Sequence, residues 1–221
     1  MNVTRPTHMA IEGVIGVGKT TLARMLKPVF GGEVILEVFE ENPFLSEFYA
    51  DRERYAFQTQ IFFLLSRYHQ QLQNIEDVLE NGSLITDYTF EKDRLFALVN
   101  LSGDELATYD KVHEALAKRI PQPDLVVYLR ARVGILMNRI AARDRPYERA
   151  IKSEYIETLQ RAYDCHFLSP VQELSTLTID TNDLDFVTRQ GDFNSIVSQI
   201  RSALSGIVQS KLPMTINEAK S

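Results

Sequence analysis

Residues 13–20 read GVIGVGKT and directly follow the short apolar run MAI at residues 9–11. The spacing Gly-x-x-x-x-Gly-Lys-Thr is typical of a phosphate-binding loop, which lies between a β-strand and the helix that follows it. Glycine allows the backbone N–H groups of such a loop to turn inward around phosphate oxygens at the start of that helix. The pattern therefore predicts a bound nucleoside triphosphate. The residues that we expect to contact it are Gly13, Val14, Ile15, Gly16, Val17, Gly18, Lys19, Thr20 and Thr21.

Two side chains of this loop carry chemistry of their own. Lys19 can reach the terminal phosphates as a point charge, and the Thr20 hydroxyl is a suitable ligand for a magnesium ion shared with those phosphates. A glycine-rich turn with an accidental lysine is the alternative interpretation. It is disfavoured because an apolar run precedes the loop and a helical pattern over residues 19–27 follows it.

Length and charge limit the classes of function. The 221 residues suit one sizeable α/β domain, and a hydrophobic content of 44% is enough for a buried core. The formal net charge of −6 gives no general attraction to a polyanion, so we expect neither nucleic acid nor an anionic membrane surface as a partner. Phosphate binding must therefore be local.

The sequence also indicates a cellular compartment. Cys165 is the one cysteine of the chain and cannot form an intramolecular disulfide, which favours a reducing environment. Residues 1–10 lack the apolar core of a signal peptide, and no later stretch has the apolar length needed to cross a bilayer. We therefore expect a cytoplasmic protein, with a polar tail at about residues 211–221.

Strand and helix patterns alternate along the chain. Alternation of this kind predicts a doubly wound, largely parallel sheet with helices on both faces. The expected strands cover residues 8–12, 34–36, 83–86, 125–129 and 177–180. The expected helices cover residues 19–27, 55–81, 93–101, 104–119, 134–143, 153–168 and 194–209.

Two acidic residues end separate predicted strands. Glu37 follows the second strand and Asp87 follows the third, on what should be the same sheet edge as the phosphate loop. One carboxylate there can accept a proton from an attacking hydroxyl, and another can hold magnesium. The alternative for each residue alone is a solvated strand end. Together with the phosphate loop, the pair favours the functional interpretation.

An arginine-rich stretch, RIAARDRPYER, lies between two predicted helices. Guanidinium groups placed over a transferring phosphoryl group stabilise its negative charge. A basic solvated helix face is the alternative, and spacing alone does not decide between them. The arginines are Arg139, Arg143, Arg145 and Arg149.

Gln58 lies early in the long predicted helix, near the aromatic residues Tyr55, Phe57 and Phe62. A carboxamide offers a donor and an acceptor side by side, which suits the edge of a nucleobase. The residues alone favour the alternative, an uncommitted surface glutamine. The four histidines show no ligand-like spacing, so we assign them no metal or catalytic role.

Four segments together resemble the deoxynucleoside kinase family. They are IEGVIGVGKTTLA, Glu37 with the ENPFL that follows it, YAFQTQIFFLLSRY and RDRPYE. The similarity covers nearly the whole chain and is greatest to bacterial members that act on deoxyadenosine or deoxyguanosine. The resemblance implies a P-loop kinase fold with a five-stranded parallel sheet flanked by helices, and a homodimer built on helices.

The resemblance also implies roles for individual residues. Glu37 corresponds to the base that takes the proton from the sugar 5′-hydroxyl, and Gln58 to the glutamine that pairs with the nucleobase. Tyr49 and Glu148 correspond to residues that share the sugar 3′-hydroxyl. Residues 139–152 correspond to an arginine-bearing lid. The arginines that match those of the lid are Arg139, Arg143 and Arg145.

The chain departs from the family pattern in two places. Better-known members carry an acid-Arg-Ser motif after the third strand, whereas this chain has Asp87, Tyr88 and Thr89. The acid is retained for magnesium, but the arginine that helps to hold the reacting hydroxyl and phosphate is missing. The cations that we expect to replace it are Lys92 or Arg94. Asn42 stands where the family has a tryptophan near the sugar.

These observations predict an ATP-dependent kinase that phosphorylates the 5′-hydroxyl of a deoxyribonucleoside, with a purine favoured and with Mg²⁺ as cofactor. A nucleoside monophosphate kinase of the thymidylate kinase type is one alternative. It is disfavoured because Tyr88 supplies no charge for an acceptor phosphate. A non-catalytic nucleotide-binding subunit of the same fold is the other alternative. Base preference and the choice of ATP or GTP as donor stay open.

Overall fold

The computed structural model of the chain describes residues 6–39, 41–170 and 174–211. Of the polar tail expected at residues 211–221, all but Lys211 lies outside the described residues. Among the helices of the described part, none is both long enough and apolar enough to cross a membrane.

A five-stranded parallel sheet forms the centre of the fold, with the strand order β2-β3-β1-β4-β5. The strands are β1 (His8–Glu12), β2 (Glu33–Ile35), β3 (Leu84–Thr86), β4 (Leu125–Arg130) and β5 (Thr176–Asp180). Every residue of β1 is buried, as are all but the last residue of β4, because helices cover both faces of the sheet. The predicted parallel α/β sheet is therefore confirmed.

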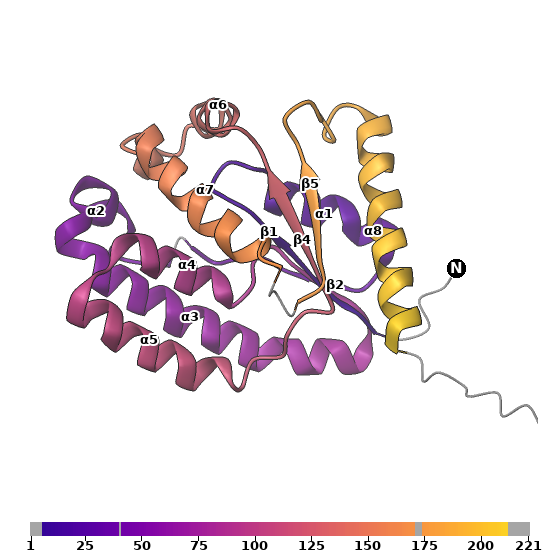
Figure 1. Cartoon of the computed structure of the whole chain (residues 1–221), viewed down its shortest axis with the longest axis horizontal. Coiled ribbons are helices and arrows are strands. Elements are labelled where there is room, and N and C mark those ends of the chain that lie inside the picture. The colour runs from indigo at the N-terminus through magenta and orange to yellow at the C-terminus, as the bar shows by residue number, and fades with distance from the viewer. Residues whose placement is uncertain (1–5, 40, 171–173, 212–221) are drawn as a thin grey trace, which may run out of the picture.

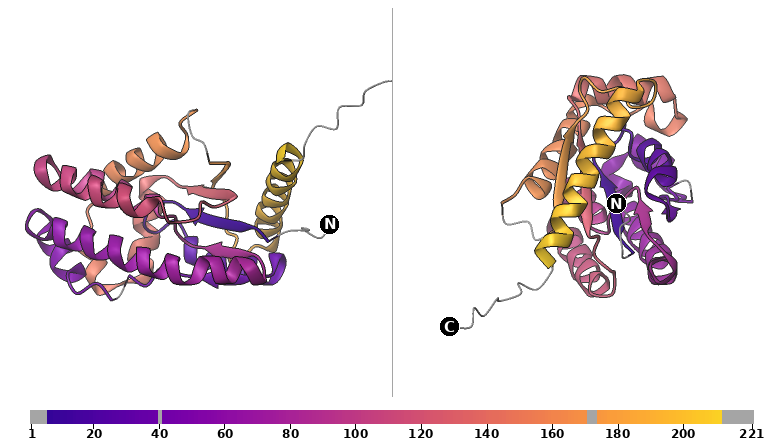
Figure 2. Two further views of the ribbon diagram at one scale, coloured as in Figure 1. Left: turned by 90° about the horizontal axis from the view of Figure 1, so that it is seen from below. Right: turned by 90° about the vertical axis from the view of Figure 1, so that its right-hand side faces the viewer.

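Helices surround this sheet (Figure 1). They are α1 (Lys19–Phe30), α2 (Leu45–Ala50), α3 (Arg52–Asn81), α4 (Glu91–Asn100), α5 (Gly103–Ala117), α6 (Val133–Arg143), the 3₁₀ helix η1 (Pro146–Glu148), α7 (Ser153–Phe167) and α8 (Gln190–Lys211). In Figure 1, α4, α5 and α7 lie to the left of the strands, the long α3 runs below them, and α8 lies to the right. Helix α4 packs between α3 and α7, and Figure 2 shows α3 and α5 running side by side.

Local sequence explains where several helices begin and end. Helix α3 starts earlier than the apolar pattern predicted because the Asp51 carboxylate caps it and accepts a hydrogen bond of 3.3 Å from the Arg54 N–H. Helix α1 ends at Phe30 with Gly31 as its C-cap residue, and Gly32 follows with φ of +80°. A Cβ atom at residue 32 would lie 2.0 Å from the Ser83 carbonyl oxygen, so only glycine fits there. The short helices α2 and η1 were not predicted from the sequence.

The parallel arrangement brings three strand ends to one edge of the sheet. Thr86, the last residue of β3, pairs with Ala10 of β1 on one side and with Ile35 of β2 on the other. The chain leaves β1 toward the phosphate loop, β3 toward Asp87 and β2 toward Glu37. Residues far apart in the sequence therefore meet at this edge, which is where open α/β sheets bind ligands.

Candidate active site

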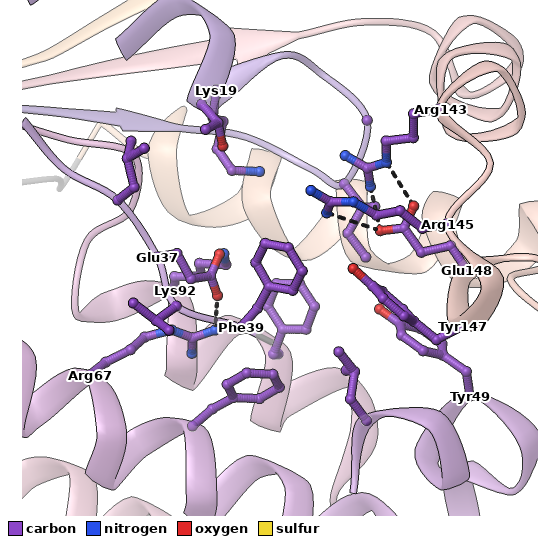
Figure 3. Close-up of a pocket in the computed structure, with 18 of the residues that line it drawn as sticks. Lys19, Glu37, Phe39, Tyr49, Arg67, Lys92, Arg143, Arg145, Tyr147 and Glu148 are labelled. Atoms are coloured by element: carbon purple, nitrogen blue, oxygen red, sulfur yellow. Dashed lines mark hydrogen bonds and ion pairs between the residues drawn. The ribbon is translucent and has the colours of Figure 1, made fainter. Parts of the chain in front are cut away.

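A cavity of about 550 Å³ opens at this sheet edge. Its walls are the phosphate loop and α1, the segment after β2, the cavity-facing side of α3, the start of α4, and residues of the α6–α7 connection. Figure 3 shows that Lys19, Glu37, Arg67 and Lys92 lie on one side of the cavity. Across the cavity from them lie Arg143, Arg145 and Glu148.

The phosphate loop adopts a conformation that requires glycine. Gly13, Gly16 and Gly18 have φ values of +145°, +86° and +106°, a region that residues with a Cβ atom rarely adopt. A Cβ atom at residue 13 would also lie 2.4 Å from the Leu129 carbonyl oxygen. The sequence motif therefore folds into a tight turn against β4, with its backbone free to approach a phosphate group.

The Lys19 side chain lies back along this loop. Its ammonium group donates hydrogen bonds to the carbonyl oxygens of Gly13, at 2.6 Å, and Val14, at 3.3 Å. Burial and the positive charge of Lys92 lower the pKa of Lys19 to about 8, although nearby carboxylates oppose this shift. A bound phosphate would supply the negative charge that favours the ammonium form.

Asp87 links the phosphate loop to the end of β2. One of its oxygens accepts a hydrogen bond of 2.5 Å from the Thr20 hydroxyl, and the other accepts one of 2.7 Å from the Glu37 N–H. The predicted convergence of the two acids on one sheet edge is therefore observed. The Thr20 hydroxyl and the Asp87 carboxylate are oxygen donors of the kind that Mg²⁺ prefers. The described residues contain no group of three or more His, Cys, Asp or Glu side chains that could hold a metal, so phosphate or water would supply the other ligands.

Two cations contact the Glu37 carboxylate. Arg67 of α3 donates to one oxygen and Lys92 of α4 to the other (Figure 3). Burial alone would raise the pKa of Glu37, but these two cations together hold the pKa well below its usual range. Arg67 also forms an ion pair with the buried Asp93 of α4. Glu37 is therefore an ionised carboxylate with its position fixed from two helices.

The opposite wall combines arginines with aromatic rings. Arg143 donates two hydrogen bonds to Glu148, at 2.7 and 2.5 Å, and a guanidinium nitrogen of Arg145 lies 3.7 Å from the same carboxylate. The rings of Tyr49 and Tyr147 are stacked with centroids 6.2 Å apart. All of these side chains line the cavity. Tyr49 and Glu148, to which the family resemblance gave the same sugar hydroxyl, therefore lie on the same wall of the cavity.

The structure contradicts the choice of Gln58. Its side chain is exposed and does not line the cavity, whereas Gln60 is 1% exposed and does. Two positions along a helix correspond to a rotation of about 200°, so Gln58 and Gln60 point in nearly opposite directions. Gln60, Phe63 and Arg67 follow the spacing i, i+3, i+7 and share the cavity face of α3. That spacing was the sequence signal that would have identified Gln60 and Arg67.

Of the two cations that the sequence left open, Lys92 lines the cavity and Arg94 does not. Arg94 is half-buried on the other side of α4 and pairs with Asp110 of α5 at 3.2 Å. The same rotation of about 200° over two residues separates it from Lys92, which is 5% exposed and contacts Glu37. Tyr88 stands where better-known family members have the arginine of the acid-Arg-Ser motif. Its hydroxyl donates a hydrogen bond of 2.5 Å to the Gln70 side chain.

Several other candidates lie outside the cavity lining, namely Asp87, Gly13, Val14, Val17, Arg139, Arg149 and Asn42. Arg139 donates to the carbonyl oxygens of Val17, at 3.2 Å, and Thr181, at 3.1 Å, so it supports the phosphate loop from behind. Arg149 pairs with Asp144 at the surface. Asn42 is buried, does not line the cavity, and ties its segment to α3 through a 3.2 Å hydrogen bond to the Thr59 carbonyl oxygen.

A phosphate loop beside an acidic strand end, on a parallel sheet with this strand order, defines the P-loop kinase fold. Residues 9–205 match the family model described as deoxynucleoside kinase. The chain belongs to the deoxynucleoside kinase family.

Individual relatives agree with this assignment. The deoxyguanosine kinase of Bacillus subtilis (strain 168) is 36% identical over 200 residues, which cover 89% of this chain and 97% of that protein. A deoxyadenosine kinase of Dictyostelium discoideum is 37% identical over 162 residues, covering 71% and 65%. A solved structure of deoxyadenosine kinase from M. mycoides, with products dCMP and a flexible dCDP bound, matches with a TM-score of 0.78 at 28% identity, covering 88% and 99%.

The two glutamines of α3 provide a matched test of the cavity face. Gln60→Ala should raise the KM for the deoxynucleoside by about tenfold or more, because a buried carboxamide aimed at a base contributes on the order of 1–2 kcal/mol. Gln58→Ala removes the same group from the solvent side and should change KM by less than about twofold. Steady-state kinetics measure both. Equal effects of the two substitutions would contradict the assignment.

Proposed function

We propose that the enzyme transfers the terminal phosphoryl group of ATP to the 5′-hydroxyl of a deoxyribonucleoside, with deoxyguanosine and deoxyadenosine as the favoured acceptors. The observation that carries the proposal is the ionised Glu37 carboxylate facing the cavity beside Asp87, Thr20 and Lys19. Relatives named deoxyguanosine kinase and deoxyadenosine kinase support the purine preference.

The transfer needs no covalent enzyme intermediate. The 5′-oxygen attacks the γ-phosphorus, the bond from that phosphorus to the β–γ bridging oxygen breaks, and ADP leaves. Glu37 accepts the proton of the hydroxyl as its oxygen becomes bonded to phosphorus. Lys19 and the backbone N–H groups of the loop stabilise the charge on the phosphate oxygens.

The remaining wall of the cavity binds the acceptor. Gln60 is 1% exposed and its amide oxygen has no hydrogen-bond partner in the described structure, as expected of a group whose partner is a ligand. In this proposal Gln60 replaces Gln58 as the residue that pairs with the base. Tyr49 and Glu148 share the 3′-hydroxyl of the sugar.

Thr20 and Asp87 would hold Mg²⁺ together with phosphate oxygens. The ion would neutralise part of the charge that develops during transfer. The hydrogen bond between the Thr20 hydroxyl and Asp87 keeps these two ligands adjacent, and the hydrogen bond from the Glu37 N–H fixes the orientation of Asp87.

Residues 139–152 form the lid of this proposal. Arg143 and Arg145 both pair with Glu148, and Arg145 also lies over the ring of Phe39 at 4.3 Å. These arginines would exchange Glu148 for phosphate oxygens when nucleotide binds, because a phosphate carries more negative charge than one carboxylate. Arg139 then supports the lid and the loop from behind rather than contacting the transferred group.

The expected homodimer and the cytoplasmic location also stay proposals. Leu65 on α3 and Leu98 on α4 are 41% and 44% exposed on neighbouring helices, and they support association through a helical face. The single cysteine, Cys165, supports a reducing compartment.

A panel of acceptors tests the proposed function directly. With ATP and Mg²⁺, ADP release should be fastest with deoxyguanosine or deoxyadenosine and at least about tenfold slower with the pyrimidine deoxynucleosides. Deoxynucleoside monophosphates should be inactive as acceptors. Preferential turnover of a monophosphate would support the thymidylate kinase alternative instead. Binding of ATP without turnover of any acceptor would support the non-catalytic alternative.

Removal of the Lys92 charge tests whether it replaces the family arginine. Lys92→Met should lower kcat by about a hundredfold, because one preorganised charge at the reacting groups is lost. It should also raise the pKa of Glu37, since Lys92 is one of the two cations that hold it down. The acid limb of the profile of kcat/KM against pH should therefore move to higher pH.

Lys92→Arg should recover most of the activity, and Arg94→Met is the matched control on the solvent side of α4. Arg94→Met should leave kcat within about twofold of the starting enzyme. If the acid limb of the Lys92→Met profile lay at the same pH as that of the starting enzyme, Lys92 would not act on Glu37.

A further inference from the structure

Glu12, the last residue of β1, is a carboxylate with no solvent exposure. It does not line the cavity, and the hydrogen bonds that it accepts come from Gly13 and Thr89. An acidic side chain in such a place is expensive to bury unless donors and cations surround it. Its surroundings therefore indicate what it does.

The Glu12 carboxylate joins two segments that are distant in the sequence. One oxygen accepts a hydrogen bond of 3.2 Å from the Gly13 N–H at the start of the phosphate loop. The other accepts two from Thr89, at 2.5 Å from the N–H and 2.8 Å from the hydroxyl. Thr89 belongs to the segment 87–92, which comprises the connection from β3 to α4 and the first two residues of α4.

That segment carries the residues on which the proposed reaction depends. Asp87 lies two residues before Thr89, and Lys92 lies three residues after it. Burial raises the pKa of Glu12, and the positive charges of Lys92 and Lys19 oppose this shift. Glu12 is therefore an electrostatic neighbour of both the lysine of the phosphate loop and the lysine that contacts Glu37.

We infer that Glu12 is a positioning residue that fixes the phosphate loop against segment 87–92, so that Lys92 stays on Glu37. This inference rests on the proposed function. Glu12 lies behind the cavity and acts on Glu37 indirectly, because it holds Thr89 and thereby the segment that carries Lys92.

A glutamine at residue 12 has nearly the same shape but the wrong chemistry. Its amide oxygen can still accept from Thr89, but its NH₂ group then faces the Gly13 N–H, so two donors oppose each other. The negative charge between Lys19 and Lys92 is also lost. An aspartate keeps the charge and shortens the reach to Thr89. The two variants thus separate charge from geometry.

The kinetic experiment compares Glu12→Gln with the exposed control Glu76→Gln of α3. Glu12→Gln should lower kcat by about thirtyfold or more and change the KM for the deoxynucleoside by less than about threefold, because only the reacting end of the cavity is disturbed. Active-site titration corrects for any unfolded fraction. Glu76→Gln should behave like the starting enzyme. An unchanged kcat in Glu12→Gln, or equal changes in kcat and KM, would overturn the inference.

Thr89 provides a second variant pair if Glu12→Gln does not fold. Thr89→Val removes one of the three hydrogen bonds to Glu12 and should lower kcat by about threefold to tenfold. Thr89→Ser keeps the hydroxyl and should recover the starting value. Failure of serine to recover activity, or no effect of valine, would contradict the proposed bridge.

A double-mutant cycle on unfolding separates this inference from the proposed function. Urea denaturation of Glu12→Gln, Thr89→Val and the double variant should show coupling, with the combined effect on the unfolding equilibrium constant at least about threefold smaller than the product of the separate effects. Coupling together with a starting enzyme that phosphorylates no deoxynucleoside would overturn the function but retain the bridge. Absence of coupling would overturn the bridge itself.

Discussion

The two hydrogen bonds of Asp87 set the geometry on which the rest of the site depends. One comes from the Thr20 hydroxyl at the phosphate loop, and the other from the Glu37 N–H at the end of β2. A short acidic side chain at the tip of β3 can accept both only because the three strands are parallel and end at one edge. The placement of Thr20 relative to Glu37 is therefore determined by the ends of the parallel strands.

Charge balance is the second constraint. Lys19, Arg67 and Lys92 are cations at this edge of the sheet, and the carboxylates of the half-buried Glu37 and of the buried Glu12 and Asp93 lie among them. Each charge is compensated by a neighbour, which a buried cluster requires in order to be tolerated. Loss of one member therefore leaves a neighbouring charge uncompensated.

The sequence alone was sufficient for the sheet, the phosphate loop, and the meeting of Glu37 with Asp87, because strand patterns and parallel connections are local or topological rules. It did not identify the correct face of a helix. Gln58 was chosen and Gln60 was not considered, and Arg94 stayed open beside Lys92. In each pair, two residues of helix rotation decide which side chain reaches the cavity. The pairing of the lid arginines with Glu148 depends on the unpredicted helix η1, so no sequence spacing could reveal it.

The most direct measurement is single-turnover phosphoryl transfer by Glu37→Gln, with ATP affinity measured separately by calorimetry. Removal of the general base should slow transfer to the preferred deoxynucleoside by at least about a hundredfold, while ATP affinity changes by less than about threefold. A transfer rate within about threefold of that of the starting enzyme would contradict the assignment of Glu37 as the base and, with it, the account of this cavity as the site of reaction.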